Sequence, residues 1–233
     1  MNKIYLLAVF AIAMGALEAI VVVYLRQLYY PLGFNFPLGF LSPQMLSVEW
    51  LREAATIVML FYIGMIAGEN PLQRFAYFLY TFAIWDIFYY AWLKVLLNWP
   101  SSFLTWDILF LIPVPWIGPV LAPIICSLTM ILFSGMIIHF QKRGYVFKIK
   151  PVEWGLIVAG VIIILGTFMW DYSKIIIDDG LLSRFWILTK DQQLLKNILN
   201  YHPTTYNWMA FLLGEILMLG AIILIFRRIK SNK

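Results

Sequence analysis

The sequence predicts an all-α integral membrane protein, a single-domain bundle of about six transmembrane helices. Three observations predict this class. Of the 233 residues, 63% are apolar and 12% are charged, whereas a soluble domain carries roughly a quarter charged residues. The mean hydropathy is +0.84. The apolar residues form continuous runs rather than alternating with polar ones, which favours membrane helices over a membrane β-barrel.

Six apolar runs are long enough, alone or with their flanks, to cross a bilayer, which takes about 20 helical residues. We expect helices at residues 4–25, 43–67, 75–97, 117–140, 154–170 and 208–226. The first run follows Met1-Asn2-Lys3 as in a signal peptide, but it is longer than a signal-peptide apolar segment and is interpreted as a retained helix. Six spans and their connections occupy nearly all of residues 1–233, which predicts one transmembrane domain.

The basic residues predict the orientation of the bundle. They gather at Lys3, Arg74, 142–150 and 227–233, and six crossings place all four segments on one side. Lys and Arg concentrate in cytoplasmic connections. We therefore expect a multi-pass inner-membrane protein with both termini in the cytoplasm. The net charge of +5 is then explained by topology signals and lipid contact, so membrane lipid is the expected partner and nucleic acid is not.

The three connections expected on the outer face are long: residues 26–49, 98–116 and 171–207. The last of them contains a capping box, Thr189 and Gln192. Beyond the capping box, apolar residues recur at helical spacing among polar ones. They are Leu194, Leu195, Ile198 and Leu199. This pattern predicts an amphipathic helix lying on the membrane surface.

The candidate functional residues are ionisable side chains within or near the ends of the apolar runs. Burying one charge in hydrocarbon costs at least about 2.5–3.5 kcal/mol, so each needs a partner, water or a proton. The primary candidates are Glu18, Glu53, Asp86, Glu215 and Arg52. The four acids occupy four different helices at similar predicted depth. We expect one outward-facing site in which some carboxyls are protonated or a cation is bound, because acids outnumber bases.

Secondary candidates are placed beside the primary ones by helical spacing. Glu49, Arg52 and Glu53 share one stripe of a helix, and Asp86, Tyr90 and Lys94 recur at intervals of four. Asp107 in the second outer loop could extend the same site. The alternative for every one of these residues is a hydrogen bond to a neighbouring helix that only holds the bundle together.

Several cofactor chemistries are not expected. His139 and His202 fall on opposite sides of the predicted membrane, and Cys126 is the single cysteine. A bis-histidine haem, a di-iron centre and a His/Cys zinc site therefore lack ligands. The chain has no nucleotide-binding loop. No cofactor is expected except a bound cation such as Mg²⁺ or Ca²⁺, which prefers carboxylate oxygens.

Three functions fit these residues. The leading hypothesis is a small transport or binding protein with an outward-facing, carboxylate-lined cavity for protons, a metal ion or a cationic small molecule. The first alternative is an intramembrane enzyme that acts on a lipid or isoprenoid by carboxylate acid/base chemistry. The second alternative is a structural or assembly subunit, whose acids meet basic residues of a partner subunit.

Overall fold

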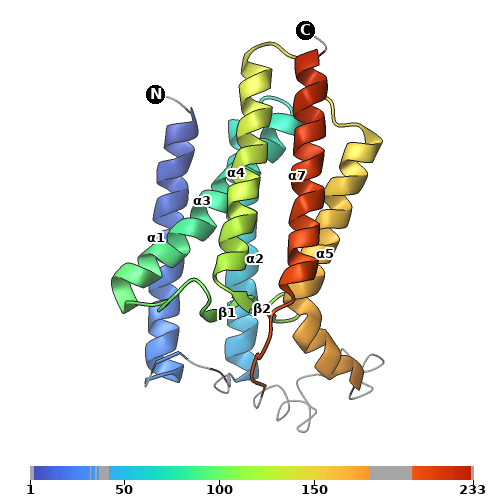
Figure 1. Ribbon diagram of the computed structural model, residues 1–233. Coiled ribbons are helices and arrows are strands. Elements are labelled where there is room, and N and C mark those ends of the chain that lie inside the picture. The colour runs from blue at the N-terminus through green and yellow to red at the C-terminus, as the bar shows by residue number, and fades with distance from the viewer. Residues whose placement is uncertain (1–2, 32, 35, 37–41, 179–200, 232–233) are drawn as a thin grey trace.

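The computed structural model describes residues 3–31, 33–34, 36, 42–178 and 201–231 and places them in a helical bundle with one β-hairpin (Figure 1). In chain order the elements are α1 (Lys3–Tyr29), α2 (Pro43–Ala67), α3 (Pro71–Leu97), β1 (Trp106–Phe110), β2 (Trp116–Pro119), α4 (Leu121–Lys142), α5 (Pro151–Asp178) and α7 (Trp208–Ser231). The amphipathic helix expected after Thr189 lies outside the described residues.

Five of these helices are long and apolar enough to span a membrane: α1, α2, α4, α5 and α7. The expected helical class is thereby confirmed, while the count of six spans stays a prediction. The sixth predicted span corresponds to α3, which has 27 residues and a length of about 40 Å. It has many tyrosines and tryptophans, with Asp86 and Lys94, and is not among the five helices that are apolar enough. It runs obliquely across the bundle (Figure 1).

Several element boundaries differ from those expected: α1 ends at Tyr29, α3 begins at Pro71, α5 begins at Pro151 and α7 ends at Ser231. Two further differences have local causes. The helix predicted from residue 117 begins at Leu121, because the segment before it pairs as an antiparallel β-hairpin. Gly118 and Pro119, which are poor helix formers, lie in the second strand. The helix expected to end at residue 170 continues to Asp178, since no glycine or proline interrupts it before Gly180.

Local sequence explains where two helices begin. Ser42 caps α2 by accepting a hydrogen bond from the Met45 backbone, and Asn70 caps α3 by accepting one from Gln73. A proline follows each capping residue, at the first helical position, where its missing N–H is not needed. The α2–α3 connection is consequently only three residues long, from Gly68 to Asn70.

The helices α1 and α2 both pack against α3. The helix α4 packs between α3 and α7, and α5 packs against α7. Glycines allow the close approaches. A Cβ atom on Gly15 of α1 would lie 3.0 Å from the Trp85 carbonyl oxygen, and one on Gly64 of α2 would lie 2.7 Å from the Phe78 nitrogen. The two helices are therefore held on one face of α3, and the hairpin lies at the end of the bundle away from the termini (Figure 1).

Replacing Gly64 by alanine is expected to destabilise the protein by about 1–3 kcal/mol, because the added methyl group would force the α2 and α3 backbones apart. The matched control is Gly135→Ala on α4, where a Cβ would meet no atom within 4 Å. Thermal unfolding of both variants in detergent would measure the difference. Equal melting temperatures for the two variants would contradict the inferred close packing.

Candidate functional site

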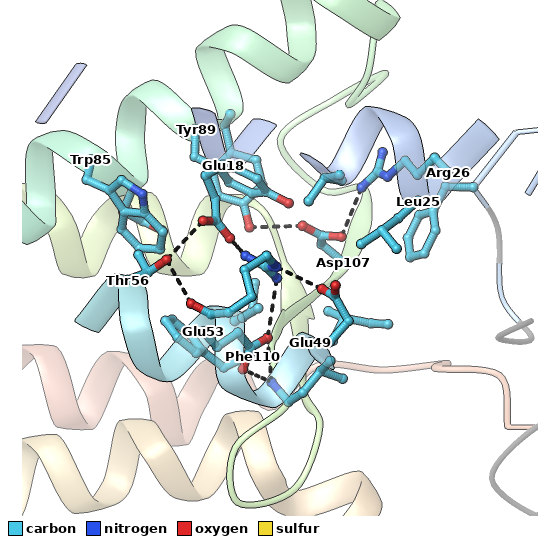
Figure 2. Close-up of a pocket in the computed structure, with 18 of the residues that line it drawn as sticks. Glu18, Leu25, Arg26, Glu49, Glu53, Thr56, Trp85, Tyr89, Asp107 and Phe110 are labelled. Atoms are coloured by element: carbon cyan, nitrogen blue, oxygen red, sulfur yellow. Dashed lines mark hydrogen bonds and ion pairs between the residues drawn. The ribbon is translucent and has the colours of Figure 1, made fainter. Parts of the chain in front are cut away.

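A cavity of about 130 Å³ lies between α1, α2, α3 and the hairpin (Figure 2). Its lining combines aromatic side chains with seven ionisable ones. The acids are Glu18, Glu49, Glu53, Asp86 and Asp107, and the bases are Arg26 and Arg52. The cavity therefore contains three more acids than bases.

Arg52 is surrounded by three glutamates. Its guanidinium pairs with Glu18 of α1, its Nε donates to Glu49 Oε2 at 2.8 Å, and Nη2 is 3.9 Å from Glu53 Oε1. In Figure 2 the three carboxyls converge on this guanidinium, Glu18 from α1 and Glu49 and Glu53 from α2. Thr56 adds a hydrogen bond to Glu18 Oε2 at 3.1 Å. Glu18 belongs to α1, whereas Arg52 and Thr56 belong to α2, so this charged network links the two helices directly.

Glu53 also joins α2 to the hairpin. The backbone N–H of Leu111, just after β1, lies 3.1 and 2.9 Å from the two Glu53 carboxyl oxygens. The strand pairing is irregular between Ile108 and Phe110, directly before this contact. Such a bulge re-aims the backbone of a strand. The Leu111 amide thus turns toward α2 instead of pairing within the hairpin.

Arg26 and Asp107 form a second, more deeply buried ion pair. Arg26 Nη2 lies 3.3 Å from Asp107 Oδ1, and the Tyr90 hydroxyl donates to Asp107 Oδ2 at 3.2 Å. The guanidinium carbon also lies 4.4 Å from the ring centre of Phe34 and 3.7 Å from that of Trp99, and these two rings meet edge to face. Burial raises the pKa of Asp107 to about 6, and Arg26 opposes that rise. The carboxyl is therefore mostly ionised at neutral pH and pairs with Arg26 as a charge.

Asp86 is the one cavity acid that forms no ion pair with a described residue. Ser127 of α4 donates to its Oδ2 at 2.8 Å, and no Lys, Arg or His of the described chain forms an ion pair with it. Its neighbour one turn away, Tyr90, also lines the cavity. Lys94, two turns away, does not. The Lys94 ammonium is exposed and donates to the carbonyls of Asn98 and Pro100, where it caps the end of α3.

Glu215 is buried in α7 but does not line this cavity. Thr129 of α4 donates to its Oε2 at 2.7 Å, and its Oε1 has no hydrogen-bond partner among the described residues. The four acids expected to share one site are thus separated by α4. Glu18, Glu53 and Asp86 line the cavity on one side, and Glu215 lies on the other.

Arg26, Phe34 and Trp99 were not among the residues expected in the site. One signal for Arg26 was present in the sequence: it is a basic residue on the side assigned to the outer face, where the charge rule disfavours it. A charge placed against that rule suggests a specific partner. The partner itself, Asp107, lies 81 positions away along the chain, so sequence spacing could not pair them.

Metal binding is not supported by the described residues, among which no group of three or more His, Cys, Asp or Glu is placed to hold an ion. The cavity carboxylates are instead directed at arginine, hydroxyl and backbone donors. No protein-family model, curated protein or solved structure matches the chain. The geometry of the cavity is therefore the basis for assigning a function.

Proposed function

We propose that this protein is a small multi-pass transport or binding protein whose carboxylate-lined cavity accepts a cation. The observation that carries the proposal is the count of five carboxyls against two guanidiniums around one cavity. Buried charges of one sign need protons or counter-ions. A bound proton or cationic small molecule would relieve the excess, and the unpaired Asp86 is the first place where it would act.

The proposal includes a topology in which the cavity faces outward from an inner membrane. Both termini lie at one end of the bundle, and the hairpin lies toward the other (Figure 1). The basic segments at 142–150 and 227–230 are at the terminal end. The positive-inside rule assigns that end to the cytoplasm. The cavity beside the hairpin would then open toward the outer face, with α3 as the sixth crossing.

The test compares two isosteric variants, Asp86→Asn and Glu215→Gln. Each keeps an oxygen that can accept the existing hydrogen bond, from Ser127 or Thr129, and each removes one buried carboxyl. Only Asp86 lines the cavity. We expect Asp86→Asn to weaken cation binding at least about tenfold, which is 1.4 kcal/mol, and Glu215→Gln to bind as the wild type does.

Binding would be measured by titration calorimetry on detergent-purified protein with propylamine, tetramethylammonium and Mg²⁺ as probes. A thermal shift provides a second readout, because a ligand at 100 times its Kd adds about 2.7 kcal/mol of stability. The proposal fails if no probe binds to the wild type, or if Asp86→Asn binds every probe as tightly as Glu215→Gln. The charged network would then have only the role of joining α1, α2 and the hairpin.

A further inference from the structure

We propose that the end of the bundle that holds both termini carries a binding site for the headgroup of an anionic phospholipid. The site is built on the connection between α4 and α5, residues 143–150, which we call the basic strap. Exposed basic residues at the ends of α4 and α7 complete it. The cavity takes no part in this site, so the inference holds or fails independently of the proposed function.

The second half of the strap presents alternate side chains to the bundle. Phe147 is 7% exposed, and Tyr145 and Ile149 pack against the same apolar core. The ring centres of Tyr145 and Phe147 lie 5.3 and 6.5 Å from that of Phe140 on α4. Alternation with a period of two is typical of an extended backbone. The side chains between these three residues therefore face away from the bundle.

The outward row consists of Val146, Lys148 and Lys150, all exposed. Backbone contacts hold this row in place. Arg228 of α7 donates to both Glu153 carboxyl oxygens at 2.8 Å and to the Lys148 carbonyl oxygen at 2.5 Å. The Lys150 backbone N–H donates to Glu153 Oε2 at 2.7 Å. The strap is thus fixed beside the end of α7 (Figure 1), while the two lysine side chains point outward.

The positive charge of this end is not balanced within the described chain. The described acids at this end are Glu69, which pairs with Lys3 at 3.0 Å, and Glu153, which pairs with Arg228. The other exposed basic residues here form no ion pair with a described residue. They are Lys142, Arg143, Lys148, Lys150, Arg227 and Lys230. A basic cluster next to membrane-spanning helices attracts anionic lipid headgroups.

Exposed apolar side chains beside the lysines favour a lipid over a soluble anion. Val146 is 76% exposed in the same row as Lys148 and Lys150, and Val152 and Trp154, in the first turn of α5, are 72% and 39% exposed. The strap connects two helices that are long and apolar enough to span a membrane, and a connection this short must stay at the membrane surface. There, the apolar side chains would contact acyl chains while the lysines bind phosphate.

The test compares dioleoylphosphatidylglycerol with dioleoylphosphatidylcholine, whose acyl chains are identical and whose headgroups are anionic and zwitterionic. Titrations of detergent-purified protein, followed by native mass spectrometry, would give both affinities. We expect the wild type to bind the anionic lipid at least about tenfold more tightly, and this preference to decrease as salt is added. In Lys148→Gln/Lys150→Gln the preference should fall below about threefold, because two of the charges that attract the lipid are removed.

Two further double variants serve as controls. Lys94→Gln/Lys174→Gln removes two exposed lysines at the hairpin end and should keep the full preference, as should Lys148→Arg/Lys150→Arg, which retains both charges. Equal affinity of the wild type for the two lipids, or a full preference in Lys148→Gln/Lys150→Gln, overturns the inference. Displacement of the anionic lipid by an equal concentration of glycerol 1-phosphate also overturns it, because the site would then recognise a soluble phosphate compound.

Discussion

Removing the Arg52 side chain is expected to destabilise the protein by about 3–5 kcal/mol at neutral pH, one of the two largest effects that the structure implies. Glu18, Glu49 and Glu53 converge on this guanidinium, and their side chains are 12%, 5% and 8% exposed. In Arg52→Ala they would face one another with no base between them. Only protonation or an added cation could relieve the repulsion.

The prediction is checked by thermal unfolding of Arg52→Ala at neutral and acidic pH, with Lys94→Ala as the control. Lys94 is also a basic residue near the hairpin end, but its ammonium is exposed and bonds only to carbonyls. Its loss should change stability by less than about 1 kcal/mol. The Arg52→Ala defect should shrink at acidic pH, because protonated carboxyls no longer repel each other. A defect that is the same at both pH values would mean that lost packing, not charge, causes it.

The helical class of the fold could be predicted because its signal is compositional. Apolar runs of about 20 residues leave the backbone few alternatives, and prolines with capping residues at Ser42 and Asn70 mark helix starts. The hairpin was missed because Trp106–Pro119 is apolar and short, and its pairing depends on contacts with α4 and α5. An apolar run of that length can be a strand, a buried loop or the end of a helix.

The sequence predicted how deep in the membrane the site residues lie, but not which way their side chains point. Glu18, Glu53 and Asp86 were identified because carboxyls in apolar runs are costly, and Glu215 has the same signal. In a helix that is apolar all round, periodicity does not show which face meets which neighbour. Asp86 and Glu215 lie on opposite sides of α4. Ser127 of that helix donates to Asp86, and Thr129 donates to Glu215.

The second large effect is expected at the buried pair of Arg26 and Asp107. Their side chains are 9% and 3% exposed, so losing one partner leaves an uncompensated charge in a site with little water. We expect Arg26→Gln alone, and Asp107→Asn alone, to lower stability by about 3–5 kcal/mol each. Asp107 retains the Tyr90 hydrogen bond in the first variant, but one neutral donor does not replace a guanidinium.

The double variant decides how this loss is interpreted. The cost of removing two charges from water can offset most of their attraction. Replacing both members of a buried ion pair at once therefore often changes the stability very little. The double variant Arg26→Gln/Asp107→Asn should therefore be markedly more stable than either single variant, with a coupling of about 2 kcal/mol or more in a double-mutant cycle. Additive losses would instead assign the effect to separate contacts, above all those of Arg26 with Phe34 and Trp99. The strong coupling expected here would mean that the pair fixes how α1 meets the hairpin, and so the shape of the cavity, while adding little to total stability.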